Sequence, residues 1–111
     1  MKSEKHFKRF FEKYITSIEN KTDKTRTELL NNSGLSRQIL YRWLKPGSFP
    51  RPGNVYMFFE NTYPKINKND YDVDTYKKLL QERQDQLQKL FNEAYFSLLL
   101  DFHEHKKSTF C

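Results

Sequence analysis

Apolar side chains recur every three or four positions along residues 4–19, with lysines among the intervening positions. This spacing puts the apolar groups on one face and predicts an amphipathic helix. The apolar face consists of Phe7, Phe10, Phe11, Tyr14, Ile15 and Ile18. The opposite face carries Lys5, Lys8 and Lys13, which we expect to be solvated.

Residues 25–47 show a second pattern, which predicts two short helices joined by a sharp turn. Thr25 and Glu28 have the spacing of a capping box, in which a hydroxyl and a carboxylate satisfy the free amides that open a helix. Gly34 tolerates the positive φ that a sharp turn requires, and Ser36 is a suitable cap for the second helix. The side chains expected to face inward from that second helix are Ile39, Leu40, Trp43 and Leu44.

The rest of the chain predicts a fourth helix, a linker and a long C-terminal helix. Residues 54–62 have helical apolar spacing, whereas residues 63–71 contain Pro64 and several polar residues that are typical of a linker. Residues 72–107 lack Pro and Gly and favour one long helix. The wholly polar interval 81–86 leaves open a break between two shorter helices.

The C-terminal helix has an apolar end. Residues 94–102, AYFSLLLDF, are apolar nearly all round, which indicates burial on several sides. We expect a second copy of the chain to cover them, so that the segment acts in dimerisation. The residues predicted for this contact follow a roughly heptad spacing and are Leu87, Leu90, Phe91, Ala94, Tyr95 and Leu98. The alternative is that the helix folds back over the first and fourth helices as an extra part of the core.

These elements predict an all-α fold with three parts. Residues 1–62 form a compact four-helix domain, residues 63–71 a linker, and residues 72–107 a helical dimerisation segment. With 111 residues, the chain has room for one small domain and one extension.

The distribution of charge points to a polyanionic partner. The net charge is +6, and residues 1–68 hold 14 Lys and Arg against 6 Asp and Glu, or +8. Residues 69–111 hold 6 against 8, or −2. The basic charge therefore accompanies the two short helices, which favours a nucleic-acid-binding unit over a uniformly basic surface.

Several classes of protein are not favoured. The only cysteine is Cys111, the N-terminus lacks the pattern of a signal peptide, and the apolar run at residues 94–102 is too short to span a bilayer. We therefore expect a cytoplasmic protein. No nucleophile elbow, glycine-rich phosphate loop or acid–base pair is evident, so we expect neither an enzyme nor a cofactor.

A metal site is not expected either. Residues His103, Glu104, His105 and Cys111 are of metal-binding types. However, two positions that are two apart on a helix point in different directions, so His103 and His105 cannot easily share an ion.

The order of residues between Thr25 and Gly47 resembles the Cro and lambda-repressor (XRE-like) family of helix-turn-helix proteins. The family core is a capped helix with Leu-Ala, a glycine, an aliphatic-Ser pair, an aliphatic residue and Trp. Those slots are filled here by Thr25, Leu29-Leu30, Gly34, Leu35-Ser36, Leu40 and Trp43. Two departures are Leu30 in the alanine slot and Ser33 in a slot that is normally apolar. The resemblance covers residues 5–62.

The resemblance implies that the second short helix, residues 36–45, enters a DNA major groove. The implied DNA contacts are Arg26, Arg37, Gln38, Tyr41, Arg42, Lys45 and Arg51. Arg37 and Gln38 suit guanine and adenine edges respectively, while Arg26, Lys45 and Arg51 suit phosphates. Trp43 is expected to be a core residue.

The sequence therefore predicts a sequence-specific transcriptional regulator, for example a repressor, that binds double-stranded DNA as a homodimer. By analogy with the family, it resembles small regulators of phages and other mobile elements. One alternative is a protein-interaction module, such as an antirepressor or an inhibitor of a host nuclease, that binds through the C-terminal helix. Another is an architectural factor that bends DNA.

Overall fold

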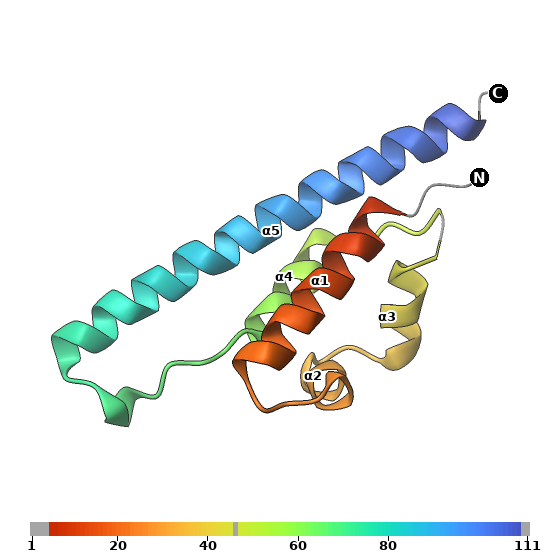
Figure 1. The fold of residues 1–111 in the computed structure, drawn as a ribbon. Coiled ribbons are helices and arrows are strands. Elements are labelled where there is room, and N and C mark those ends of the chain that lie inside the picture. Colours follow the sequence, from red (N-terminus) through yellow and green to blue (C-terminus); the bar gives the residue numbers. More distant parts are fainter. Residues whose placement is uncertain (1–4, 46, 110–111) are drawn as a thin grey trace.

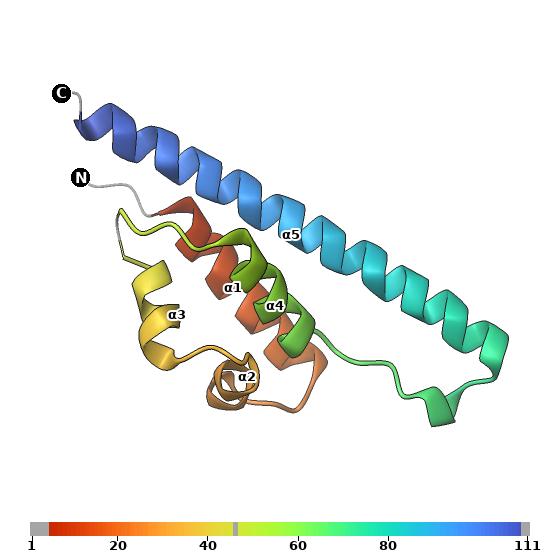
Figure 2. The ribbon, with the colours of Figure 1, turned by 180° about the vertical axis from the view of Figure 1, so that it is seen from behind.

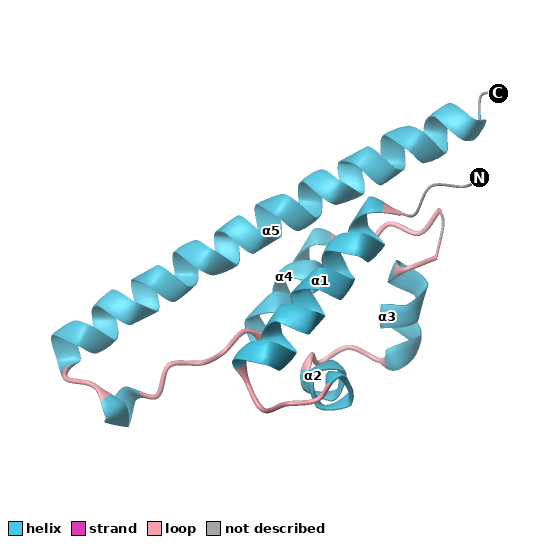
Figure 3. Cartoon of the chain, viewed as in Figure 1, coloured by secondary structure: helices cyan, strands magenta, loops and turns pink. Residues whose placement is uncertain are grey.

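A computed structural model of the chain describes residues 5–45 and 47–109, with side chains as far as Glu104, and every regular element in that part is a helix. The all-α class is confirmed for these residues (Figure 3). The elements are α1 (His6–Lys21), α2 (Arg26–Asn32), α3 (Arg37–Trp43), α4 (Pro52–Thr62), the short 3₁₀ helix η1 (Lys68–Asp70) and α5 (Val73–Thr109).

The helices form three layers. The middle layer consists of α1 and α4, which both pack against α5 on one side (Figure 1). On the opposite side lie α2 and α3, and the view from behind shows the same arrangement (Figure 2). The middle layer therefore lies between α5 and the two short helices.

The core between these layers is largely aromatic, as the spacing on α1 and α4 predicts. Phe11 of α1 stacks on Phe58 of α4 with 5.1 Å between ring centroids, and Trp43 of α3 meets Phe58 edge-on at 6.0 Å. Trp43 is only 4% exposed, so its expected core role is confirmed. Large rings let a short chain bury much apolar area with few residues.

The C-terminal segment is a single helix, which confirms the favoured interpretation over two shorter helices. With 37 residues, α5 is about 55 Å long at 1.5 Å per residue. The part of α5 before Arg83 extends beyond the other helices, and the part between Arg83 and Asp101 lies along α1 and α4 (Figure 1). The polar interval at residues 81–86 falls where the helix reaches the domain.

We expect a second chain to cover the apolar residues of this helix. For one face of α5 that expectation is wrong, because helices of the same chain cover it. Leu87 and Ala94 are fully buried and Leu98 is 6% exposed, all within the core cluster that α1 to α4 also form. Leu90 and Phe91 pack partly against the same core, while Tyr95 stays 43% exposed. The alternative of a helix folded back over α1 and α4 therefore describes this face of α5.

Most element boundaries lie close to their predicted positions. Helix α4 begins at Pro52 rather than at residue 54, because proline lacks an amide hydrogen and suits the first turn of a helix. The linker contains η1, where the Asn67 side chain accepts a hydrogen bond from the Asn69 amide at 3.0 Å. Cys111 lies outside the described residues. Within the part of the chain that is described, no helix combines the length and apolarity needed to cross a membrane.

Candidate nucleic-acid interface

The two short helices α2 and α3 are each started by a local cap. Thr25 Oγ1 accepts a hydrogen bond from the Glu28 amide at 3.2 Å, and Ser36 Oγ accepts one from the Ile39 amide at 3.2 Å. The bond to Thr25 Oγ1 is the hydroxyl half of the predicted capping box, and the Thr25 hydroxyl itself donates a long hydrogen bond to the Glu28 carboxylate at 3.4 Å. These caps fix where both helices begin.

The turn between α2 and α3 is built around Ser33 and Gly34. Gly34 has φ of +82°, which confirms the positive φ expected of it. Ser33 is fully buried, and its hydroxyl donates to the Leu30 carbonyl at 2.7 Å and accepts from the Leu35 amide at 3.2 Å. A serine is tolerated in this normally apolar slot because the turn itself satisfies its hydroxyl.

The inner and outer faces of α3 differ sharply. Leu40 and Trp43 are buried, whereas Gln38, Arg42 and Lys45 are exposed and Tyr41 is 51% exposed. The outer four residues line one open pocket of about 460 Å³. None of these four side chains takes part in a hydrogen bond or ion pair among the described residues. The structure thus brings together four of the seven predicted DNA contacts.

Arg37 lies beside this group at the first position of α3. Its Nη2 donates to Asn31 Oδ1 on α2 at 3.3 Å, a long contact at the surface that a stronger acceptor can displace. Arg37 is half-buried, and this long contact with Asn31 holds its side chain only weakly.

Arg26 has a different environment from the one predicted. Its guanidinium forms two hydrogen bonds to Glu12 of α1, with Nη1 at 2.5 Å from Oε2 and Nη2 at 3.0 Å from Oε1. The hydrogen bond from Arg26 lowers the pKa of the Glu12 carboxyl, and the same bond raises the pKa of Arg26. Arg26 thus already has an anionic partner, which weakens its expected role at a phosphate.

Arg51 is also set apart. It is the residue before α4 and is exposed, and it does not line the pocket on α3. Its side chain makes no cap for α4. Of the predicted contacts, Arg26 and Arg51 are therefore the two that the structure does not group with the outer face of α3.

A lysine that the sequence assigns to a solvated face holds the other end of α3. Lys5 Nζ donates to the carbonyls of Trp43 at 2.7 Å, Lys45 at 3.2 Å and Ser48 at 2.7 Å. The last carbonyls of a helix lack partners within it, so a lysine there stabilises its C-terminus. Burial lowers the pKa of Lys5, and the charge of Asp101 opposes that change in pKa. The expectation of a solvated Lys5 is wrong.

Asp101 of α5 provides the cap that α1 lacks locally. Its Oδ1 accepts from the His6 amide at 2.6 Å and its Oδ2 accepts from the Phe7 amide at 2.9 Å. Asp101 is 6% exposed, and a carboxylate is favourable at the positive N-terminal end of a helix. The only nearby sequence signal was an aspartate within an apolar run, which does not reveal its partner.

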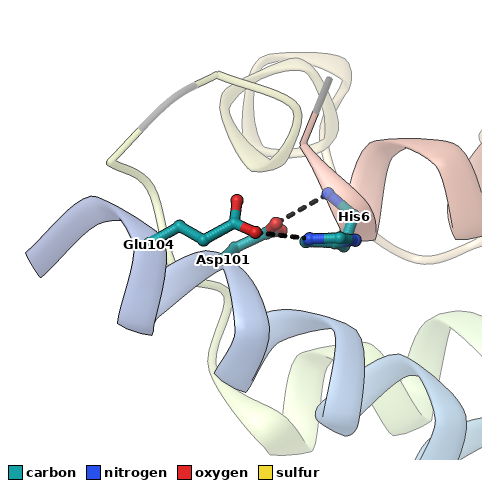
Figure 4. Close-up of side chains that lie close together, drawn as sticks. All are labelled: His6, Asp101 and Glu104. Atoms are coloured by element: carbon teal, nitrogen blue, oxygen red, sulfur yellow. Dashed lines mark hydrogen bonds and ion pairs between the residues drawn. The ribbon is translucent and has the colours of Figure 1, made fainter. Parts of the chain in front are cut away.

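His6 and Glu104 complete a cluster with Asp101 (Figure 4). His6 Nε2 lies 2.8 Å from Glu104 Oε1, and the potential ligand atoms of all three residues lie within 4.8 Å of one another. Both Asp101 oxygens already face amides at the positive end of α1, which disfavours a cation. Hydrogen bonding between the ends of α1 and α5 accounts for this cluster without a metal. The side chain of His105 and all of Cys111 lie outside the described residues.

An apolar surface remains on the outer side of α5. Its residues are Tyr95, Phe96, Leu99, Leu100 and Phe102, each between 36% and 62% exposed. We call these five residues the outer face of α5. Of the six predicted dimerisation residues, only Tyr95 belongs to this surface.

Comparisons with models of protein families, with curated proteins and with solved structures find no match to this chain.

Proposed function

We propose that the protein is a sequence-specific DNA-binding regulator with a helix-turn-helix formed by α2 and α3. The observation that carries this proposal is the outer face of α3, where four exposed side chains surround one pocket: Gln38, Tyr41, Arg42 and Lys45. Within the described residues, none of these side chains forms a hydrogen bond or an ion pair with another part of the protein. Glutamine and arginine present hydrogen-bond groups that match base edges, and lysine matches phosphate. In contrast, Lys5 and Arg26 have well-defined partners within the protein.

The proposed recognition unit has three supports besides this surface. Local caps at Thr25 and Ser36 fix both helices, and the turn contains a glycine with positive φ. Leu40 and Trp43 hold α3 on the core, so its polar side faces away from it. The basic N-terminal part of the chain supplies the charge that attraction to DNA requires.

The protein is proposed to act as a homodimer on a two-fold-related operator. One recognition helix reads only a half-site, and dimers of such proteins place two of them about one helical turn of DNA apart. The outer face of α5 is the surface proposed for this contact, since Leu87, Ala94 and Leu98 are occupied within the monomer. Exposed apolar patches of this kind mark sites of association. A cytoplasmic regulator of transcription, of the kind that phages and other mobile elements encode, fits this size and charge.

The experiment is a selection of duplexes from a random DNA pool, followed by fluorescence anisotropy with the selected duplex and a scrambled one. Gln38→Ala and Arg42→Ala are each expected to lower the preference for the selected duplex, by about 1–3 kcal/mol where the pair is bidentate. Lys78→Ala, on the projecting N-terminal part of α5, removes one positive charge as Arg42→Ala does and should preserve the preference. A pool that shows no enrichment contradicts sequence-specific binding.

The second candidate is a protein-interaction module, which the exposed outer face of α5 favours. Sedimentation of the full chain measures its oligomeric state. Together with the DNA selection, it distinguishes a DNA-binding regulator from a protein-interaction module. A dimer that dissociates on Leu99→Asp supports the regulator, whereas a monomer that enriches no DNA supports a module that binds another protein.

A further inference from the structure

Two cationic side chains hold the C-terminal ends of two helices in similar ways. Lys5 donates to three carbonyls at the end of α3 and in the loop after it. Arg83 of α5 donates to three carbonyls at the end of α4, those of Glu60 at 3.0 Å, Tyr63 at 3.2 Å and Pro64 at 2.9 Å. Each cation also lies over an aromatic ring, Lys5 at 5.7 Å from Phe49 and Arg83 at 5.8 Å from Tyr63.

The two helices depend on these cations to different degrees. Helix α4 has 11 residues and buries Val55, Phe58, Phe59 and Thr62. Helix α3 has seven residues and buries only Leu40 and Trp43. Short helices owe most of their stability to tertiary contacts, so the contacts of Lys5 are a large share of what holds α3.

Lys5 is itself held in place from α5. It directly precedes α1, whose first two amides donate to the Asp101 carboxylate. The ring of Phe102 also meets Phe49, in the loop after α3, edge-on at 5.2 Å. A continuous set of contacts therefore runs from the end of α5 through the start of α1 to the C-terminal end of α3.

We propose that Lys5 is a positioning residue that fixes the orientation of α3 on the domain and so sets which bases its outer face reaches. Lys5 has no free donor directed at DNA, because Nζ is shared among three carbonyls of the protein. Its effect is on geometry, and a displacement of about 1 Å at a recognition surface is enough to lose directional hydrogen bonds. This inference rests on the proposed DNA-binding function.

The test compares Lys5→Met with Arg83→Met. Each variant loses one positive charge and three contacts to carbonyls at a helix end, but only the first affects α3. Lys5→Met is expected to lower the preference for the selected duplex over the scrambled duplex by about tenfold or more, the value of one base-reading contact. Arg83→Met should keep the preference, and both should bind the scrambled duplex alike. An equal preference in both variants overturns the inference.

Amide hydrogen exchange without DNA provides a readout that does not depend on the proposed function. Exchange at residues 40–45 should be faster in Lys5→Met than in Arg83→Met when both are compared with the unmodified chain. If the unmodified chain shows no sequence preference, the proposed function fails while the exchange still decides whether Lys5 positions α3. Unchanged exchange at residues 40–45 overturns the inference. Should Lys5→Met not fold, Lys5→Gln, which keeps part of the donor, should show an intermediate loss of protection.

Discussion

The side-chain amide of Asn61 donates a hydrogen bond of 2.7 Å to the backbone carbonyl of Ser33. This bond ties α4 to the turn between α2 and α3, which is the place where the two short helices change direction. The same amide nitrogen lies 3.0 Å from the position that a Cβ atom at Gly34 would occupy. The turn is therefore restricted twice at Gly34, by its φ of +82° and by the space that Asn61 leaves.

The first prediction concerns Gly34→Ala. A left-handed conformation costs an L residue about 1–2 kcal/mol, and the displaced Asn61 would weaken its bond to Ser33. We expect the free energy of unfolding in urea to fall by at least about 1 kcal/mol.

Gly53→Ala is the matched control for this prediction. Gly53 lies in the first turn of α4, and a Cβ there would meet nothing within 4 Å. This substitution should stabilise the protein by about 0.4–1 kcal/mol, because alanine restricts the unfolded chain. Equal effects of the two substitutions would contradict the account of the turn.

The second prediction separates the two sides of α5. Leu87→Ala should lower the free energy of unfolding by about 2–5 kcal/mol, since Leu87 is fully buried and the change leaves a cavity. Leu99 is 49% exposed, so Leu99→Ala should change the stability of the monomer by less than about 0.5 kcal/mol. Urea unfolding at low protein concentration measures both. A small effect of Leu87→Ala would mean that α5 does not pack on the domain in solution.

The third prediction concerns acid stability through Glu12 and Arg26. The hydrogen bond from Arg26 lowers the pKa of Glu12 in the folded state. The resulting stabilisation is present above the pKa of the unfolded group, about 4.3, and is lost as the pH falls through the lowered pKa of the folded state. The pair is partly exposed to solvent, so its contribution is on the order of 0.2–1 kcal/mol.

Urea midpoints for the unmodified chain and Glu12→Gln, measured from neutral pH down to about pH 3, test this prediction. The difference between the two should shrink as the pH falls. A difference that is independent of pH would show that the carboxylate charge does not stabilise the fold.

The sequence predicts the helix caps and the apolar faces of this fold well, because each depends on residues that are only a few positions apart. The caps at Thr25 and Ser36 act on amides three residues away, and the apolar spacing on α1 follows the period of the helix. The contacts of Lys5 and Asp101 span 38 or more positions, and no pattern within α1 or α5 indicates them. From the sequence alone, Lys5 and Asp101 are predicted to be ordinary charged residues. Their partners are evident only once the fold brings the helix ends together.

The sequence also does not predict which apolar residues of α5 are buried. Its spacing predicts a helix with an extensive apolar surface, but not which side meets α1 and α4 and which stays exposed. Ala94 is fully buried and Phe96 is 62% exposed, although the phenylalanine is by far the more apolar side chain. Which side is buried depends on how α5 lies against α1 and α4, and the spacing within α5 does not reveal this, so the predicted dimer contacts fall mostly on the buried side.

The last prediction concerns Tyr14, which is 5% exposed between α1 and α4. The Thr62 hydroxyl donates to the Phe58 carbonyl at 2.7 Å, so the Tyr14 hydroxyl must donate to Thr62 Oγ1 at 2.8 Å. Burial raises the pKa of Tyr14 to about 12. Because the folded state holds this proton more tightly than the unfolded chain does, the stabilisation is present below about pH 10 and is lost as the pH rises toward 12.

Tyr14→Phe should therefore cost about 0.5–1.5 kcal/mol at neutral pH, the net value of one hydrogen bond. It should also flatten the loss of stability at alkaline pH relative to the unmodified chain, because phenylalanine cannot ionise. Urea unfolding across the alkaline range compares the two directly, and the other tyrosines contribute equally to both curves. Parallel curves would mean that Tyr14 ionises as readily in the folded chain as in the unfolded one, which its burial beside Thr62 does not allow.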